Sequence, residues 1–458
     1  MRYKAYKNTE ISWVNRIPEH WQTKRIASIF DLRKEKNDPV KTTEVLSLSA
    51  KYGVTPYSKR KEKGGNKPKA DMTKYNVCHK GDILVNSMNV VAGSVGISEY
   101  YGAISPVYYA LSTNTKENNN YFMEYIFRNY DFQRSMVGLG KGIMMNESEE
   151  GVLTTVRMRI SWDTLKTLLV PVPPKEEQEQ IAKFLDWKVN EIDKLVEIEK
   201  KRIFLIKESI KSAHIELILG HNNVERMNFT DEKFLQTIPE NWQVVKLQRV
   251  LSKIELDANA KDEIVICSNH GYSYIRGDKK IGLSSDDNKY YQKVCKGQIM
   301  IHGMDTWHGA ICISDLDGKC TRVVHVCETN ENKQYIVYYL RLLAFLGMYK
   351  PYSNGVRQNT SDFRSWKVLG NIDIILPPRY EQDMIVDLLT KYIEKNNYII
   401  NYLEKKIELL ESLKSSLISE VVTGKIDIRN IEIPTYEKVE INIDEDFEDE
   451  DVEIEEEV

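Results

Sequence analysis

Long hydrophobic runs are missing from this sequence: no stretch of about 18 consecutive apolar residues occurs among its 458 residues. A helix that spans a bilayer needs such a stretch, so we predict no membrane span. The first ten residues, MRYKAYKNTE, also lack the apolar segment of a secretory signal. We therefore expect a cytoplasmic protein, with no membrane partner and roughly two to four structural units.

Motifs that mark catalysis on nucleic acids are missing too. There is no Asn-Pro-Pro-Tyr, no GxGxxG between a strand and a helix, and no GxxxxGK[ST]. Pro-Pro occurs at 173–174 and 377–378, but valine or leucine precedes it and a basic residue follows it. We expect no methyltransferase, nuclease or ATPase activity from this chain alone, no catalytic residues and no cofactor of its own. A stand-alone enzyme with a cryptic site is the alternative, which turnover by the purified chain would support.

Cysteine is scarce, at six residues. Four cysteines and three histidines share a short window: Cys295, His302, His308, Cys312, Cys320, His325 and Cys327. Neither CxxC nor HxxxH occurs among them, and structural zinc sites usually show such spacings. We favour free, buried cysteines in strands over a metal site.

Negative charge is concentrated at the C-terminal end. Residues 434–458 carry a net charge of −12 and the whole chain carries −4, so residues 1–433 carry +8. A basic body favours an anionic partner. We assign residues 431–458 to an acidic, disordered tail. Solubility is its simplest role, and competition with nucleic acid for the basic surface is the alternative.

What the sequence does contain is a long internal repeat. The phrase IPEHW at 17–21 returns as IPENW at 238–242. Further segments return in the same order: 77–88 as 293–304, 93–97 as 309–313, 105–111 as 321–327, 141–146 as 354–359, and 172–185 as 376–389. The offset falls from 221 to 204, as expected when surface loops differ in length. The chain is predicted to hold one module twice.

Each module ends in a segment with apolar residues at intervals of three and four, which predicts a long helix. The segments run from Glu176 to Gly220 and from Glu381 to Gly424, each after Pro-Pro and each ending at glycine. The first apolar series is Ile181, Phe184, Leu185, Ile192, Leu195, Val196, Ile203, Ile206, Ile210 and Leu217. The second is Ile385, Leu388, Leu389, Tyr392, Ile399, Leu403, Leu410, Leu413 and Leu417. A single apolar seam needs a partner, and we expect the two helices to pair.

The rest of each module combines strand-like pieces, such as DILV and EIVIC, with a helix expected at about 119–135 and again at 332–348. We predict an α+β protein: two similar mixed α/β domains separated by two long antiparallel coiled-coil helices, with an internal two-fold repeat. The expected boundaries are a first domain at 1–172, a helical spacer at 173–220, a second domain at 221–375, a second spacer at 376–430, and the tail.

Positive charge gathers in the first module. Residues 51–80 hold nine lysines and arginines against two acidic residues, with three tyrosines between them. Basic side chains attract phosphates, and aromatic side chains can meet sugars and base edges. The candidate DNA contacts in this stretch are Lys59, Arg60, Lys61 and Lys67. A solvated basic loop is the simpler alternative.

Two loops in each module are candidates for contacts with bases. Asparagine can bind adenine through two hydrogen bonds, and the arginine fork matches guanine. The candidates are Asn86, Asn89, Lys141 and Asn146 in the first module, and His302, Asp305, Arg357 and Asn359 in the second. Ordinary turn chemistry, a phosphate contact or a salt bridge would explain the same residues. For Trp21 and Trp242 we expect a structural role at the entry to each domain.

Taken together, the IPExW opening, KGDILVNSMN at 80–89, the PPxxEQ helix entry and SEVVTGKIDIR at 419–429 resemble the specificity subunit of Type I restriction–modification systems. The resemblance covers nearly the whole chain except the acidic tail. It implies two target-recognition domains, each reading one half of a bipartite, asymmetric double-stranded DNA target. It also implies that the helices set the unread spacer and dock two methyltransferase subunits.

The resemblance implies further partners. S-adenosylmethionine is expected in the methyltransferase subunits, which methylate adenine, and ATP with magnesium in a restriction subunit that cleaves DNA when it joins. A coiled-coil scaffold that joins proteins rather than DNA is the remaining alternative, and failure to bind any duplex would favour it.

Overall fold

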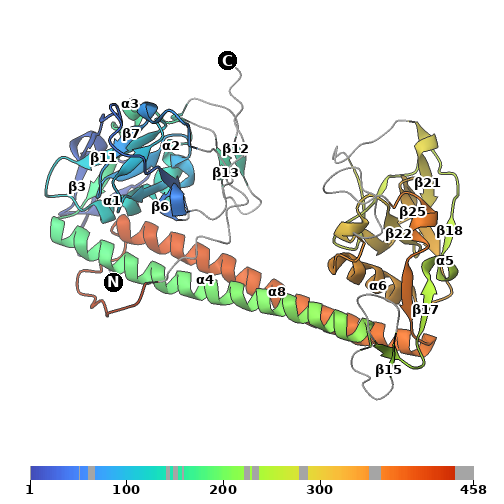
Figure 1. Cartoon of the computed structure of the whole chain (residues 1–458). Coiled ribbons are helices and arrows are strands. Elements are labelled where there is room, and N and C mark those ends of the chain that lie inside the picture. Colours follow the sequence, from blue (N-terminus) through green and yellow to red (C-terminus); the bar gives the residue numbers. More distant parts are fainter. Residues whose placement is uncertain are drawn as a thin grey trace. The chain divides into compact units, whose positions relative to one another are not determined.

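The computed structural model describes residues 2–50, 52–59, 68–140, 145–147, 153–156, 159–220, 227–229, 237–277, 287–349 and 363–438 (Figure 1). The chain divides into two compact units. Unit 1 comprises Met1–Lys200 and Glu404–Val458, and unit 2 comprises Lys201–Leu403. Each unit therefore holds one globular part together with one end of each long helix. In the described residues, no helix has the length and apolar character to cross a membrane.

Unit 1 is built around a four-stranded antiparallel sheet in the order β4-β11-β8-β9. These strands are β4 (Phe30–Leu32), β8 (Ile83–Asn86), β9 (Val95–Ile97) and β11 (Tyr108–Thr113). Smaller antiparallel pairs are β1 (Tyr6–Asn8) with β2 (Arg16–Pro18), β3 (Gln22–Arg25) with β14 (Leu169–Val172), β5 (Leu46–Ser49) with β6 (Gly53–Pro56), β7 (Asn76–Cys78) with β10 (Gly102–Ile104), and β12 (Met145–Glu147) with β13 (Leu153–Val156). The helices are α1 (Asn120–Phe127), α2 (Tyr130–Met136) and α3 (Trp162–Leu165).

Unit 2 repeats this plan with the sheet order β18-β25-β22-β23. The strands are β18 (Ser252–Ile254), β22 (Ile299–His302), β23 (Ile311–Ile313) and β25 (Val324–Glu328). The pairs are β15 (Met227–Phe229) with β16 (Thr237–Pro239), β17 (Gln243–Lys246) with β26 (Asp373–Leu376), β19 (Val265–Cys267) with β20 (Ser273–Ile275), and β21 (Tyr291–Val294) with β24 (Gly318–Thr321). The helices are α5 (Leu247–Val250), α6 (Lys333–Phe345) and α7 (Trp366–Leu369). The predicted internal repeat is confirmed: the four-stranded sheet and four of the strand pairs recur, and only the pair of β12 with β13 has no counterpart among the described residues of unit 2.

The two long helices are α4 (Lys175–Ile218) and α8 (Arg379–Val422), each of 44 residues, as the apolar spacing predicts. Both end at a glycine with positive φ: 74° at Gly220 and 72° at Gly424. A Cβ on Gly424 would lie 2.4 Å from Cδ of Pro18, and one on Gly220 would lie 2.8 Å from Cγ of Pro239. Each of these two positions requires glycine for two reasons. The backbone there is left-handed, and a Cβ would collide with the proline of an opening phrase.

Within each unit the helices run antiparallel. In unit 1, Lys406 pairs with Glu199 at 2.7 Å and Lys414 pairs with Asp193 at 2.9 Å. Residue numbers therefore rise along α8 in the direction in which they fall along α4. In unit 2, the Ser209 hydroxyl lies 2.6 Å from the Tyr392 hydroxyl. The predicted pairing is confirmed.

For three residues, the prediction that they lie in the apolar seam between the helices was wrong. Leu195, Leu388 and Leu413 are 44%, 49% and 55% exposed, whereas Val196 and Leu389 are 3% and 0% exposed. Consecutive residues of an α-helix point about 100° apart, so Leu195 beside Val196 and Leu388 beside Leu389 must turn away from the partner helix. Leu413 has no such apolar neighbour, since Ser412 and Lys414 flank it.

The helix expected at 119–135 is divided into α1 and α2. Asn129 separates them: its backbone is extended, with φ −70° and ψ 127°, and its side chain accepts a hydrogen bond from the Phe132 N–H. An N-cap side chain of this kind starts a new helix rather than continuing the old one. In unit 2 the equivalent segment is the single helix α6.

The cysteines are free thiols. Cys312, Cys320 and Cys327 are buried in strands, as predicted, whereas Cys295 is partly exposed in a turn. Among the described residues, no group of three or more His, Cys, Asp or Glu side chains is arranged to hold a metal ion.

Candidate functional site

The first candidate loop has the same backbone in both units. It leaves β8 or β22, makes one 3-10 turn (Val90–Ala92 or Thr306–His308) and enters β9 or β23. The N–H of Asn86 donates to the Ser94 carbonyl at 3.0 Å, and the N–H of His302 donates to the Ala310 carbonyl at 2.9 Å. The turn closes on a left-handed glycine in both copies. The repeat therefore presents different side chains from one backbone frame.

In unit 1 the two asparagines of this loop differ in access. Asn86 is only 9% exposed, and its Oδ1 accepts a hydrogen bond from the Met88 N–H at 3.0 Å. That bond is ordinary turn chemistry, the alternative considered for this residue. Asn89 is exposed. Of the two, Asn89 is the one that a large ligand can reach without opening the turn.

In unit 2, His302 faces Asp305. The Nδ1 of His302 accepts a hydrogen bond from the Asp305 N–H at 3.1 Å and also lies 3.1 Å from the Asp305 carboxylate. Burial lowers the pKa of His302, and the nearby carboxylate opposes that shift. Burial is the larger effect, so we assign a neutral imidazole with its proton on Nε2. That tautomer offers one donor, which suits a guanine acceptor.

In each unit, the second candidate loop ends next to the first candidate loop. The N–H of Ile160 donates to the Ser87 carbonyl at 2.9 Å, and the N–H of Phe363 donates to the Gly303 carbonyl at 2.8 Å. Ile160 ends the segment that contains 141–158, and Phe363 ends the segment that contains 350–362. The structure thus places the return of each second loop against the first loop of the same unit.

Two buried side chains bind the backbone at the points where the second loops return. Sequence reasoning missed both. The Tyr109 hydroxyl donates to the Ile160 carbonyl at 3.0 Å, and Nε2 of His325 bonds the Phe363 carbonyl at 2.7 Å. Tyr109 and His325 occupy the same place in β11 and β25, where SPVYYAL aligns with TRVVHVC. Their alignment in the repeat could have indicated a shared role, although no motif marks it.

Several candidates lie outside the described residues: Arg60, Lys61, Lys67, Lys141, Arg357 and Asn359. Asn146 is described by its backbone alone, in β12. Lys59 ends a 3-10 turn (Tyr57–Lys59), and its ammonium lies 5.4 Å from the centroid of the Tyr100 ring. No contact joins Lys59 to Asn86 or Asn89 in the part of the chain that the structure describes. The base contacts proposed for all these residues stay predictions.

The repeated opening phrase anchors each domain to a helix. The indole N–H of Trp21 donates to Glu177 at 3.0 Å, and that of Trp242 donates to Glu381 at 2.7 Å. Both tryptophans are buried. The structural role expected for them is confirmed. Sequence reasoning missed the glutamates as partners of the tryptophans, although PPxxEQ follows each phrase, with Glu177 156 residues after Trp21 and Glu381 139 residues after Trp242.

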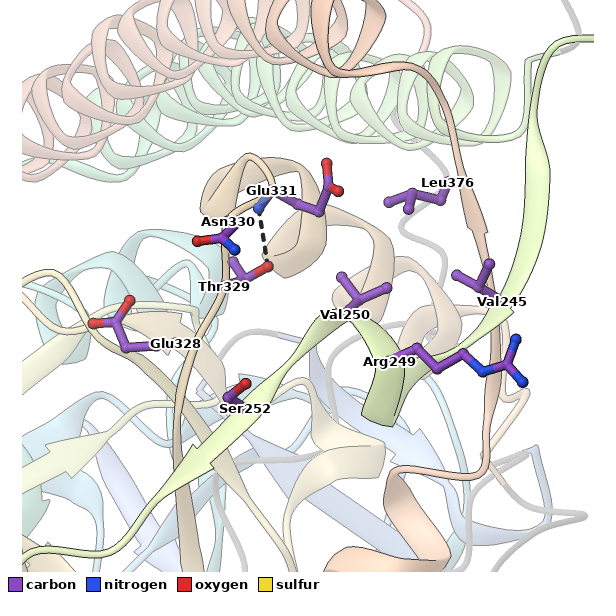
Figure 2. Close-up of a pocket in the computed structure, with 9 residues that line it drawn as sticks. All are labelled: Val245, Arg249, Val250, Ser252, Glu328, Thr329, Asn330, Glu331 and Leu376. Carbon is purple, nitrogen blue, oxygen red and sulfur yellow. Dashed lines mark hydrogen bonds between the residues drawn. The ribbon is translucent and has the colours of Figure 1, made fainter.

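Unit 2 also has a shallow pocket of about 390 Å³. Figure 2 shows its lining, in which Val245, Val250 and Leu376 lie on one side and the turn of Glu328 to Glu331 on the other. Thr329 accepts a hydrogen bond from the Glu331 N–H at 3.0 Å, which fixes that turn. None of the predicted site residues lines this pocket, so it is separate from the candidate loops.

Comparison with known proteins decides the family. The sequence profile of the Type I restriction modification DNA specificity domain matches residues 18–208 and again residues 239–409. The chain belongs to this family. The two matches begin at the two opening phrases and take in most of both long helices, so each specificity domain extends into the helical region.

Relatives of the family align along nearly their whole length. The Type I restriction enzyme MjaVIII specificity subunit of Methanocaldococcus jannaschii is 26% identical, over 91% of this chain and 95% of the relative. The putative type I restriction enzyme MjaX specificity subunit of the same organism is 23% identical, over 93% and 97%. One solved chain comes from work on complex assembly and conformational transition of the type I R-M system. Its structure matches this one with a TM-score of 0.60 and 14% sequence identity, over 99% of that chain and 90% of this one. That likeness supports the fold.

Proposed function

We propose that this chain is the specificity subunit of a Type I restriction–modification complex, and that each specificity domain reads one half of a bipartite DNA target. The observation that carries the proposal is one loop frame with two sets of side chains. Asn86 and Ser87 stand in unit 1 where His302 and Gly303 stand in unit 2. Equal frames with unequal side chains suit two different half-sites.

The chain acts by binding, and the chemistry belongs to its partners. In this proposal two methyltransferase subunits dock on the helical region and carry S-adenosylmethionine, which supplies the methyl group for adenine. A restriction subunit that uses ATP and magnesium adds cleavage when it joins. The missing catalytic motifs and the family membership support a chain without catalysis of its own.

Exposed apolar side chains on the long helices support docking of protein subunits there. In unit 1, Leu195 and Leu409 are 44% and 65% exposed, and in unit 2, Phe204 and Tyr398 are 62% and 77% exposed. Large apolar side chains that lie along a helix and face solvent are typical of a surface covered by another protein.

Methylation mapping in cells tests the proposal. Cells that hold this chain with its methyltransferase are compared with cells that lack this chain. We expect a split motif that is methylated only when the chain is present: two short specified blocks around a fixed, unspecified gap. A soluble complex that gives no new methylation, together with failure of the chain to bind any duplex, would favour the protein scaffold instead.

A further inference from the structure

The hairpin of β19 and β20 carries three rings in a row, of which His270 and Tyr272 are exposed and Tyr274 is partly buried. The His270 and Tyr272 rings are stacked, with centroids 6.3 Å apart and an interplanar angle of 13°. The Tyr272 and Tyr274 centroids are 6.1 Å apart. Tyr272 is 52% exposed, and His270 is exposed at the turn. We call His270, Tyr272 and Tyr274 the aromatic row. Large rings kept in water at a hairpin tip gain nothing for the fold, which points to a binding role.

The base of the hairpin is rigid. Val265 and Cys267 are buried and pack in one core cluster with Met300 of β22 and Cys312 of β23. The sulfur atoms of Cys267 and Cys312 are 3.4 Å apart. The row is therefore held by the same sheet that ends in the loop of His302 and Asp305.

Arg341 of α6 ties the hairpin turn to that loop. Its Nη1 donates to the Gly309 carbonyl at 2.6 Å and to the Asn269 carbonyl at 3.3 Å. A Cβ on Gly271 would lie 2.3 Å from Nη1 of Arg341, and φ at Gly271 is 88°. Burial lowers the pKa of Arg341. A partly buried guanidinium that donates hydrogen bonds to carbonyls of both segments keeps the turn and the loop side by side.

Unit 1 has the same arrangement with other side chains. Arg128 takes the place of Arg341, and its guanidinium donates to the Val95 carbonyl at 3.5 Å, beside the hairpin of β5 and β6. A Cβ on Gly53 of that hairpin would lie 3.7 Å from the same guanidinium. This hairpin opens the lysine-rich stretch 51–80. The matching stretch in unit 2, 267–296, has six lysines and arginines, three acidic residues and four tyrosines.

We propose that the aromatic row of unit 2 is a contact of the second specificity domain with duplex DNA, next to the bases read by the loop of His302 and Asp305. This rests on the proposed DNA-reading function. In the internal repeat the row aligns with the start of the basic stretch 51–80 of unit 1, so we infer that it meets the same polyanion with ring faces and fewer charges. Tyrosine and histidine rings contact deoxyribose and base edges without neutralising a phosphate.

The test is equilibrium binding of the full-length chain to its mapped target over a range of salt concentrations. Tyr272→Ala should weaken binding to the full target by roughly tenfold, the order seen when one aromatic contact to a nucleic acid is removed. The slope of log affinity against log salt should not change, because no phosphate contact is lost. Tyr272→Phe keeps the ring face and should bind like the wild type.

Targets with one scrambled half-site locate the effect. The loss in Tyr272→Ala should appear only on targets that keep one particular half-site, the one read by unit 2. Phe345→Ala is the matched control, since Phe345 is an aromatic residue that is 54% exposed at the end of α6 in the same unit. It should bind DNA like the wild type, and all variants should melt at the wild-type temperature.

Three results would overturn the proposal. The first is wild-type affinity in Tyr272→Ala, and the second is an equal loss in Tyr272→Phe. The third is normal DNA binding with lost assembly of the methyltransferase subunits, which would make the row a protein contact. In each of these cases the wild-type chain still binds its split target, so the proposed function stands. If the wild-type chain binds no duplex, both proposals fail.

Discussion

At the scale of single residues, a buried carboxylate joins each globular part to its helix. Glu177 is 6% exposed and receives bonds from the Trp21 indole at 3.0 Å, the His20 ring at 2.8 Å and the Tyr3 hydroxyl at 2.5 Å. Burial and this carboxylate raise the pKa of Tyr3, so the phenol stays protonated and donates. Glu381 receives bonds from Trp242 and Asn241 in the same way.

Removing the Glu177 carboxylate should destabilise unit 1. Glu177→Ala leaves the buried donors of Tyr3 and Trp21 without an acceptor, at a cost of about 2–4 kcal/mol. The free energy of unfolding in urea measures this loss. Glu176→Ala is the matched control, because Glu176 is exposed in the same helical turn, and it should change stability by less than about 0.5 kcal/mol. Equal stability of the two variants would contradict the anchoring role.

His214 should make unit 2 sensitive to acid. Burial lowers the pKa of His214 to about 4, and its ring packs against Tyr338 with centroids 5.1 Å apart. An unfolded histidine titrates near pH 6.5, so the unfolded chain binds more protons than the folded chain between about pH 6.5 and pH 4. Stability must therefore fall as the pH falls through that window, by an amount on the order of 3 kcal/mol from this residue.

Unfolding experiments at several pH values check this slope. His214→Phe removes the titrating group and should flatten the loss of stability below pH 6.5, relative to the wild type. His308→Phe replaces an exposed histidine of the same unit and should leave the slope unchanged. A wild-type slope in His214→Phe would mean that His214 is not buried as a neutral ring.

At the scale of elements, the two long helices are matched by charge as well as by apolar side chains. The carboxylate of Glu199 is nearly buried, with 4% of its side chain exposed, while Lys406 is 40% exposed. The pair bridges α4 and α8 at 2.7 Å. Its main effect is on the buried partner, because Lys406 is the cation that α8 supplies to this carboxylate.

Lys406→Ala should cost about 1–3 kcal/mol of unfolding free energy, less than for a fully buried pair because water screens the lysine. Lys200→Ala removes the exposed partner of Glu197, at 3.5 Å within α4, and should cost less than about 0.5 kcal/mol. A double variant, Glu199→Lys with Lys406→Glu, should recover part of the loss. Additive losses in the double variant would contradict a direct pair.

Elements with strong local signals could be predicted from the sequence, and long-range contacts could not. The spacing of apolar residues and the glycines at 220 and 424 were sufficient for both long helices and their ends. They could not identify Leu195 or Leu413 as outward-facing, because this depends on where the partner helix lies. The roles of Glu177, Tyr109 and Arg341 depend on neighbours far along the chain. The PPxxEQ motif marks Glu177 but not its partners, and no motif marks Tyr109 or Arg341.

The same limit applies to the candidate site. Repeat alignment correctly matched Asn86 with His302, because strands and turn glycines keep that register. It could not show that the side chain of Asn86 is hydrogen-bonded within the turn while Asn89 is exposed. The choice between these two asparagines depends on one side-chain hydrogen bond, from the Met88 N–H to Asn86.

At the scale of the whole molecule, the residues that anchor each domain are the same in both copies of the repeat, whereas the residues that face outward differ. Trp21 and Trp242, Glu177 and Glu381, and Gly424 and Gly220 repeat as identical pairs. The groups that face outward from the loops and hairpins differ between the units. One frame used twice, with different exposed side chains, allows half-sites to change by substitution without refolding a domain.

If the helices set the gap between the half-sites, lengthening both should lengthen the gap. Seven residues added between Lys200 and Lys201, and seven more between Leu403 and Glu404, keep the ion pairs of unit 1 in register. Seven helical residues add about 10 Å, which corresponds to about three base pairs of duplex at 3.4 Å each. Methylation mapping should then show both specified blocks unchanged around a longer unspecified gap.

A single insertion provides the control for this experiment. Seven residues added after Asn190 alone move Asp193 and Glu199 past Lys414 and Lys406, so that α4 and α8 lose their matched register in unit 1. We expect this variant to lose specific methylation, while the double insertion retains it with the longer gap. An unchanged gap with full methylation in the double insertion would show that the length of the helices does not set the spacing. The spacer would then have to be fixed by contacts within the complex other than the paired helices.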